Sequence, residues 1–197
     1  MNRGLLFQPL KPFIIHQKFG ENRACRPLDG SQKVITCDGN NPPEGWKSLY
    51  GPNGHPAIDL RAKHGQEVYA AQTGDVYMID TKERSGLDVR IESVVEGRRL
   101  RHTYEHLMGY QVRVGDHVTV GQVIGWADNT GWSSGDHLHF KVEEYIDGKW
   151  VIIDPLSVMS TRFALDALAT QNTIKYIAEL TARLFDRWGD YIRNKSK

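Results

Sequence analysis

The sequence predicts a mainly β fold with a C-terminal α-helical extension. Between residues 66 and 151, short runs of alternating apolar and polar residues are separated by glycine, a pattern typical of antiparallel strands joined by tight turns. After residue 158, apolar residues recur every three or four positions, which is the helical period. The 197 residues, 40% of them hydrophobic, suffice for one domain of ordinary size and an appendage.

The expected strands follow one another closely along the central region. The run "EVYAAQTGDVYMID" indicates two strands around its glycine, and "LDVRIESVVEGRRLRHTYEHL" indicates a hairpin that turns at Glu96–Gly97. In the second strand of this hairpin, Tyr104 and His106 are expected on one face, because alternate residues of a strand point the same way. The run "VRVGDHVTVGQVIGWA" indicates three very short strands that bend at Gly115 and Gly121.

The segment of residues 20–54 differs in composition from the rest of the first 157 residues. It is rich in Gly, Pro, Asn and Asp, which predicts an irregular loop or lid with a small hairpin. Cys25 and Cys37 lie within this segment. A disulfide between them would contribute about 3 kcal/mol in the chain-entropy model. Two unrelated thiols are the alternative, and the sequence leaves this choice open.

The chain divides into a domain of residues 1–157 and a helical tail of residues 158–197. The run "TQNT" is expected to split the tail into two helices. The tail carries an apolar stripe formed by Ile174, Ile177, Leu184, Trp188 and Tyr191. This stripe must be covered, either by packing on the β domain or by self-association or docking on a partner.

Composition excludes several classes of protein. The formal net charge of +1 gives no sign of nucleic-acid binding. No apolar run approaches the ~18 residues of a transmembrane helix. The first 20 residues contain two prolines and lack the features of a signal peptide. Export is therefore expected to occur by another route, after removal of a leader, or through lysis.

The run "GDHLHF" carries the first functional signal, because it places His137 and His139 two residues apart. Leu138 and Phe140 alternate with these histidines, so the segment is expected to be a strand with one apolar face. Both imidazoles then project from the other face. They could share a metal ion, or one could bind metal while the other transfers protons. Two ordinary surface histidines are the structural alternative.

Two further motifs supply candidate metal ligands. In "GHPAIDL", His55 and Asp59 would lie about 13 Å apart on a regular strand. The segment must therefore bend if both side chains bind one ion. The run "TYEHL" adds His106. Catalytic zinc sites in proteins use three protein ligands and keep one position open, so five candidate side chains leave two for proton transfer.

These motifs together resemble the lysostaphin/LytM-type zinc metallopeptidases, which cut peptide bonds in peptidoglycan. The resemblance extends from "QKFGEN" to "DPL", and it is densest in "GHPAIDL", "TYEHL", the "VGD…VGQVIG" turns and "NTG…GDHLHF". It implies a small antiparallel β-sheet or split-barrel core with the site in a groove between loops. The proline after His55 departs from the usual first motif of the family.

The resemblance also implies a role for each candidate residue. His55, Asp59 and His139 would bind one zinc ion, and His106 and His137 would be the catalytic histidines that bind no metal. The implied partners are stem or bridge peptides of peptidoglycan, and the implied location is extracytoplasmic or reached through lysis. Trp132, beside the expected groove, would contact glycan or peptide if exposed and would otherwise pack in the core.

Other functions are compatible with parts of the sequence. A module of the same fold could bind the cell wall or activate an amidase without hydrolysis, but the complete set of five residues favours an enzyme. A lipoyl or sugar-phosphotransfer carrier domain shares the short strands and "GD…GQ" turns, but neither carrier explains His55 and Asp59. The sequence leaves open whether glycyl-glycine bridges or D-alanyl-diaminopimelate links are cut.

Overall fold

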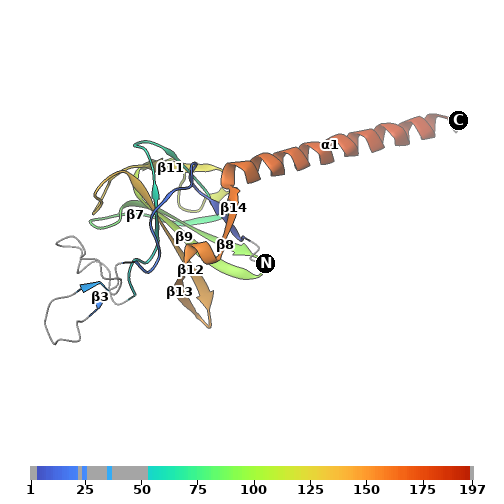
Figure 1. Cartoon of the computed structure of the whole chain (residues 1–197). Coiled ribbons are helices and arrows are strands. Elements are labelled where there is room, and N and C mark those ends of the chain that lie inside the picture. The colour runs from blue at the N-terminus through green and yellow to red at the C-terminus, as the bar shows by residue number, and fades with distance from the viewer. Residues whose placement is uncertain (1–3, 22–23, 26–34, 37–52, 196–197) are drawn as a thin grey trace.

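The computed structural model describes residues 4–21, 24–25, 35–36 and 53–195, which form a β body and one long helix. The helix extends away from the body (Figure 1). The strands are β1 (Leu6–Gln8), β2 (Ile15–Gln17), β3 (Ala24–Cys25), β4 (Ile35–Thr36), β5 (Ile58–Arg61), β6 (Glu67–Tyr69), β7 (Gly74–Lys82), β8 (Gly86–Val95), β9 (Arg98–Tyr110), β10 (His117–Val118), β11 (Val123–Ala127), β12 (His137–Ile146), β13 (Lys149–Ile153) and β14 (Met159–Phe163). A short 3-10 turn, η2 (Pro155–Ser157), precedes β14, and α1 spans Ala164–Lys195.

Ten of these strands form one antiparallel sheet that does not close into a barrel within the described part of the chain. Its central order is β10-β7-β8-β9-β12-β5-β2, while β13 pairs with β12 and β11 pairs with both β6 and β9. Leu138, Phe140 and Val142 of β12 are fully buried in the core, together with Tyr104 of the neighbouring β9. The mainly β, antiparallel fold with a C-terminal helix is therefore confirmed.

The turns of the sheet confirm one sequence prediction and correct another. The β8–β9 hairpin turns at Glu96–Gly97, where both residues have positive φ, as a two-residue type I′ turn requires. The three very short strands expected after Tyr110 are wrong, because only β10 and β11 form there. Before β10, the Asp116 carboxylate accepts a hydrogen bond from the backbone N–H of Arg113 at 2.7 Å, which favours a turn over a strand.

The C-terminal segment also differs from expectation. Residues 159–163 form β14, which pairs with β1 in a separate parallel ladder. The predicted break at "TQNT" is wrong, since α1 is continuous through it. The hydroxyls of Thr170 and Thr173 donate to the carbonyls of Asp166 and Ala169, four residues earlier, so they bond within the helix instead of capping a new one.

Only parts of the segment of residues 20–54 are described. β3 pairs with β4 in an antiparallel ladder, which confirms the small hairpin. The predicted lid lies outside the described residues. The possible disulfide between Cys25 and Cys37 lies outside the described side chains. Among the described residues, no helix has the length and apolar character needed to cross a membrane.

Candidate metal centre

Neighbouring strands β12 and β5 place two of the expected ligands side by side. The alternation on β12 is confirmed: Leu138 is buried in the core, and His137 and His139 project from the opposite face. In the antiparallel register, His139 lies directly opposite Asp59 of β5. Directly opposed residues share a face of the sheet, so the imidazole of His139 meets the carboxylate of Asp59.

His55 reaches the same place because the chain bends before β5. Residues 54–57 are not part of a strand, and Gly54 has φ +73. The backbone N–H of His55 donates to Glu21 O, and its carbonyl accepts from Gly20 N–H, both at 2.8 Å. The His55 Nδ1–H donates to Lys18 O at 3.2 Å, which turns Nε2 toward Asp59. The bend that the spacing required is therefore confirmed.

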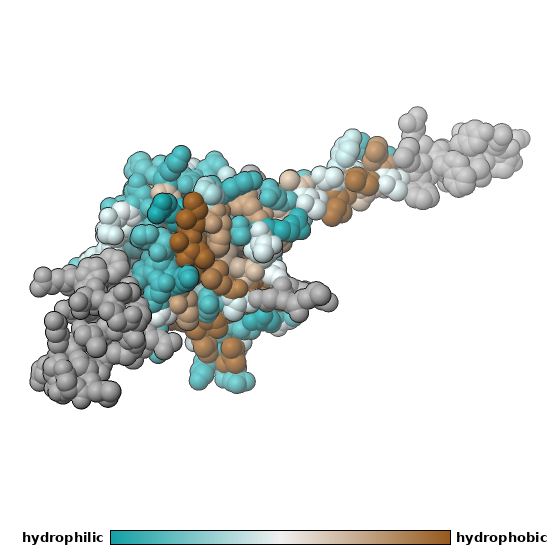
Figure 2. Space-filling model, viewed as in Figure 1, coloured by the Kyte–Doolittle hydropathy of each residue, from teal (hydrophilic) through white to brown (hydrophobic). Residues whose placement is uncertain are grey.

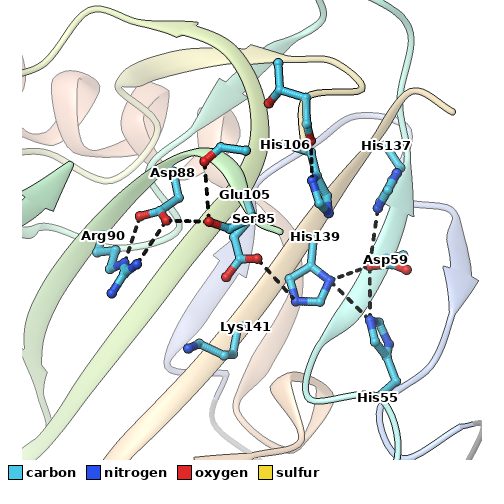
Figure 3. A network of polar contacts seen from close by, with 12 residues as sticks. His55, Asp59, Ser85, Asp88, Arg90, Glu105, His106, His137, His139 and Lys141 are labelled. Carbon is cyan, nitrogen blue, oxygen red and sulfur yellow. Dashed lines mark hydrogen bonds and ion pairs between the residues drawn. The ribbon is translucent and has the colours of Figure 1, made fainter. Parts of the chain in front are cut away.

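The three side chains bring their donor atoms together in a small space (Figure 3). Asp59 Oδ1 lies 2.9 Å from His139 Nδ1 and 3.3 Å from His55 Nε2, and these two nitrogens are 3.2 Å apart. All three residues are buried. Burial raises the pKa of Asp59, but hydrogen bonds with His139 and His55 outweigh burial and hold the pKa well below its usual range. The carboxylate is therefore ionised and ready to bind a cation.

His106 corrects one prediction about the sheet. It does not share a face with Tyr104, which is buried in the core; its ring centroid lies 4.7 Å from that of His137 and 5.8 Å from that of His139. The cause is a bulge in β9, where Tyr104 pairs with Val89 but Leu107 pairs with Leu87, so β9 has one extra residue.

The backbone at this bulge is unusual for a residue other than glycine. His106 has φ +64, a conformation that costs free energy and occurs at functional sites more often than elsewhere. Its N–H donates to Ser85 O at 2.9 Å, and its carbonyl accepts from Asp128 N–H at 3.0 Å. These two hydrogen bonds hold the rotated residue in place. The rotation delivers the imidazole to the face that carries the metal ligands.

His106 and His137 present the same ring nitrogen to the site (Figure 3). The Nδ1–H of His106 donates to Thr130 O at 2.6 Å, and that of His137 donates to Gly135 O at 2.8 Å. A carbonyl oxygen only accepts, so each Nδ1 carries a proton and each neutral ring keeps its acceptor at Nε2. His137 Nε2 is 3.7 Å from Asp59 Oδ1. Burial, with the charges of His137 and His139, lowers the pKa of His106 to about 4.

Two residues that sequence reasoning missed also contact or adjoin the ligands. Glu105 lies opposite His139 in the β9–β12 register, and its Oε2 is 3.9 Å from Nε2 of His139. Burial lowers the pKa of His139, but the hydrogen bond to Asp59 and the charge of Glu105 raise it overall. Gln17 lies opposite Asp59, and its buried Nε2 has no hydrogen-bond partner among the described residues. Neither residue could be identified from its motif before the strand register was known.

Two hollows meet at the centre and form a groove across it. They enclose about 290 and 350 Å³, at the lower end of the range for ligand sites. His106, His139 and Trp132 line both of them. Trp132 is 52% exposed, with the Arg84 guanidinium 5.5 Å from the centre of its ring. Of the two readings of Trp132, the exposed aromatic beside the groove is confirmed.

The remaining described histidines are not part of this ligand group, although His16 lines one of the two hollows. His102 is fully buried in the core, and His117 is exposed beside Asp75. His64 lies at the surface with Asp128 and Asp136, and this second group also brings three possible ligand atoms within 4.8 Å of one another. Unlike the first group, it is largely exposed to water. The buried group is therefore the better-formed metal centre.

Comparisons with known proteins identify relatives over this region. The model of Peptidase family M23 matches residues 53–155. Lysostaphin of Staphylococcus simulans is 35% identical over 99 residues, which are 47% of this chain and 20% of lysostaphin. Glycyl-glycine endopeptidase ALE-1 of Staphylococcus capitis is also 35% identical over 99 residues, which are 47% of this chain and 27% of ALE-1. The chain thus spans about a fifth to a quarter of these relatives.

A solved structure supports the similarity of fold. Helicobacter pylori Csd3 aligns with a TM-score of 0.54 and 26% identity, over 89% of this chain and 43% of the Csd3 chain. The matched family region contains the five histidine and aspartate residues of the centre: His55, Asp59, His106, His137 and His139.

Proposed function

Because the chain belongs to peptidase family M23, we propose that it is a zinc-dependent endopeptidase that hydrolyses peptide cross-links of bacterial peptidoglycan. The observation that supports this most directly is the convergence of His55 Nε2, Asp59 Oδ1 and His139 Nδ1 beside two further histidines, His106 and His137, that are not members of this ligand group. The name of one relative, a glycyl-glycine endopeptidase, also describes cleavage of a peptide bond.

The three converging residues fit a single zinc ion. Two imidazole nitrogens and one carboxylate oxygen are a common ligand set for catalytic zinc, whereas structural zinc sites usually use four ligands, often thiolates. The second nitrogen of His55 is bonded to Lys18 O and that of His139 faces Glu105, an arrangement typical of metal-binding histidines. When bound, zinc supplies Lewis-acid chemistry that lowers the pKa of water toward about 7 and polarises a carbonyl.

His106 and His137 are proposed to move the protons of the reaction. Each keeps Nε2 as an acceptor because its Nδ1–H is bonded to a backbone carbonyl. One imidazole accepts the proton of the attacking water at Nε2, and that proton is then available for the leaving amine. The other imidazole stabilises the developing oxyanion or delivers a proton only as an imidazolium, with Nε2 protonated as well as Nδ1. The rigid backbone partners fix both rings, so little reorganisation is needed when a peptide binds.

The groove is proposed to hold the peptide on both sides of the scissile bond. One hollow is lined by Arg61 and residues 133–136, and the other is lined by Arg90 and Lys141. Trp132 stands where the two hollows meet and offers an apolar surface to the substrate. Peptidoglycan lies outside the cytoplasmic membrane, so we place the protein in an extracytoplasmic compartment or expect its release by lysis.

A non-hydrolytic wall-binding or amidase-activating module of the same fold is the alternative function. Such a module has no need for two imidazoles held with Nε2 toward a ligand set. The presence of both His106 and His137 in this arrangement therefore favours hydrolysis.

Four alanine variants test the proposal. His55→Ala and His139→Ala should lose bound zinc, because each removes a ligand atom. His106→Ala and His137→Ala should keep zinc and lose about 10²-fold or more in turnover, since they remove proton transfer. Zinc content and release of new amino termini from purified cell walls give the two readouts. His117→Ala, an exposed residue outside the groove, is the control, and full activity of His137→Ala would contradict its assigned role.

A further inference from the structure

The helix α1 has an apolar surface that no described part of the chain covers. Only its first turns touch the body: Ala164 and Ala167 pack with Val120, Phe7 and Tyr69. From Ala169 to Arg183 every described residue of the helix is exposed. Among these, Ile174, Tyr176, Ile177 and Leu180 are 62%, 65%, 55% and 45% exposed. Figure 2 shows brown, hydrophobic side chains on the projecting part of the helix.

The apolar residues of α1 follow a seven-residue repeat. We call the first position of the repeat a and the position three residues later d. Position a is occupied by Ile174, Thr181 and Trp188. Position d is occupied by Thr170, Ile177, Leu184 and Tyr191. This 3-4 spacing is the pattern by which two helices pack side chains into each other along a seam. Charged residues of this stretch fall mainly at other positions of the repeat, namely Lys175, Glu179, Arg183, Asp186 and Asp190.

We propose that α1 pairs in antiparallel orientation with α1 of a second copy of this chain. One register satisfies all central positions, because every a residue is then level with a d residue of the partner. Counted along the helix, Ile174 is level with Leu184 of the partner subunit, Ile177 with Thr181 of the partner subunit, and Thr170 with Trp188 of the partner subunit. The largest side chain of the seam is thus opposite a small one.

The parallel orientation fits less well. In a parallel pair, Trp188 would be level with its own copy and Thr181 with its own copy. Two large side chains would then crowd one layer of the seam, and two small polar side chains would leave another layer poorly packed. The antiparallel register also avoids repulsion at the edge of the seam. In an antiparallel pair the position before a faces the same position of the partner, so Arg187 is level with Thr173 of the partner subunit, and Leu180 is level with its own copy near the twofold axis.

The contact has the size of a weak, reversible dimer. The part of α1 beyond the turns that pack on the body, residues 169–195, is about 40 Å long and about 10 Å wide. A partner helix that covers one face of this part removes roughly 400 Å² from each copy, or roughly 800 Å² in total, a size typical of transient interfaces. The partner's helix would end beside the body, near the apolar side chains of Phe7 and Tyr69.

The dimer would affect cleavage of cell walls. This effect rests on the proposed function, whereas the dimer itself does not. Antiparallel helices place the two β bodies at opposite ends of a rod, each with its own groove. Binding at one groove raises the effective concentration of the second groove at neighbouring sites of the same polymer. Insoluble cell walls should therefore be cut faster, relative to a short soluble peptide, by the dimer than by a monomeric variant.

The oligomeric state of the full chain tests the proposal, whether or not the chain is an enzyme. Light scattering during size-exclusion chromatography should give twice the chain mass of 22.4 kDa. Ile177→Lys, at the centre of the seam, should give the monomer mass, with helix content followed by circular dichroism. Tyr176→Lys is the matched control, because it removes an equally exposed apolar side chain off the seam and should leave the dimer intact.

A monomeric wild type, a trimer or tetramer, or a dimer that survives Ile177→Lys would overturn the proposal. Spin labels test the orientation, in a background with both native cysteines replaced by serine. In the antiparallel register, labels at Glu179→Cys are level across the dimer and lie within ~25 Å, whereas labels at Asp190→Cys are offset by ~33 Å along the axis. Equal short distances at both positions would indicate parallel helices and overturn the register.

Discussion

Each histidine of the centre has one ring nitrogen that faces a fixed partner. That partner determines which of the two nitrogens, Nδ1 or Nε2, faces the candidate metal site. His55, His106 and His137 donate from Nδ1 to backbone carbonyls and present Nε2. His139 is reversed, since its Nδ1 faces Asp59 and its Nε2 faces Glu105. A carboxylate in this position orients a metal-binding imidazole and increases its basicity. We therefore infer from the structure that Glu105 positions His139, a role that its sequence motif does not indicate.

Removal of this carboxylate should weaken metal binding. Glu105→Ala is expected to lower zinc affinity by 10- to 100-fold, the usual effect of losing such a partner. Competition with a chelating dye measures the affinity. Glu143→Ala, which removes a carboxylate of β12 that pairs with Lys141, is the control and should bind zinc like the wild type. Unchanged affinity in Glu105→Ala would show that Glu105 does not position His139.

At the residue scale, much of the centre follows from spacing. The two histidines of "GDHLHF" had to share a face because alternate residues of a strand do so. The position of His106 did not follow, since the sequence predicts a regular strand through "TYEHL" and gives no signal for a bulge. A left-handed backbone is ordinarily indicated by glycine or asparagine, and here a histidine adopts it under the constraint of hydrogen bonds to Ser85 and Asp128.

At the scale of elements, the loop between β11 and β12 supports both histidines that are proposed to be catalytic. It supplies Thr130 O to His106 and Gly135 O to His137. The loop packs closely on the start of β8, because Gly131 and Gly86 approach each other without side chains. A Cβ built on Gly131 would lie 2.3 Å from Gly86 N, and Gly131 has φ +77. The absence of side chains at Gly86 and Gly131 therefore determines how closely the β11–β12 loop approaches β8.

A methyl group at this contact should disturb catalysis more than folding. Gly131→Ala is expected to displace Thr130 O, loosen the His106 ring and lower turnover by about 10²-fold, the loss that a shift of ~1 Å can cause. Zinc content should be unchanged, because no ligand moves.

Gly97→Ala is the matched control for this substitution. It also carries a positive φ of +79, but its added Cβ meets no atom within 4 Å. It should cost only the ~1–2 kcal/mol of left-handed backbone strain and keep full turnover. Equal kinetics of the two variants would show that the loop contact does not position His106.

The same scale shows why some elements could be predicted and others could not. The β8–β9 hairpin was evident because alternating strands flank a two-residue turn with glycine. β14 was not, since "MSTRF" has no clear alternation and its partner, β1, lies about 150 residues earlier in the chain. The continuity of α1 through "TQNT" was not evident from composition, which does not show that Thr170 and Thr173 bond to carbonyls of the preceding turn instead of capping a new helix. A division into residues 1–157 and 158–197 remains a proposal.

At the scale of the whole molecule, a buried polar network around His102 makes the free energy of unfolding depend on pH. His102 is fully buried; its Nε2 is 2.9 Å from Ser93 Oγ and its Nδ1 is 2.8 Å from the hydroxyl of Tyr104. Burial lowers the pKa of His102 to about 3. Below its ordinary pKa of about 6.5, the unfolded chain therefore binds a proton that the folded chain excludes.

This difference predicts a loss of stability in mild acid. The free energy of unfolding should fall by up to ~1.4 kcal/mol per pH unit as pH decreases from about 6.5 toward 3 because of His102 alone. Urea titrations between pH 7 and pH 5 measure the slope. His102→Gln should flatten it even if its absolute stability is lower, whereas His16→Gln, at an exposed position, should not. An equal slope in His102→Gln and wild type would contradict the neutral, buried state of His102.

The location of bound zinc tests the central claim most directly. Crystals of the zinc-loaded protein, measured on both sides of the zinc absorption edge, should give one strong anomalous peak among His55 Nε2, Asp59 Oδ1 and His139 Nδ1, about 2.0–2.2 Å from each. Absence of a peak at that place, or a peak only at His64, Asp128 and Asp136, would contradict the assignment of the buried centre and the hydrolytic function proposed from it.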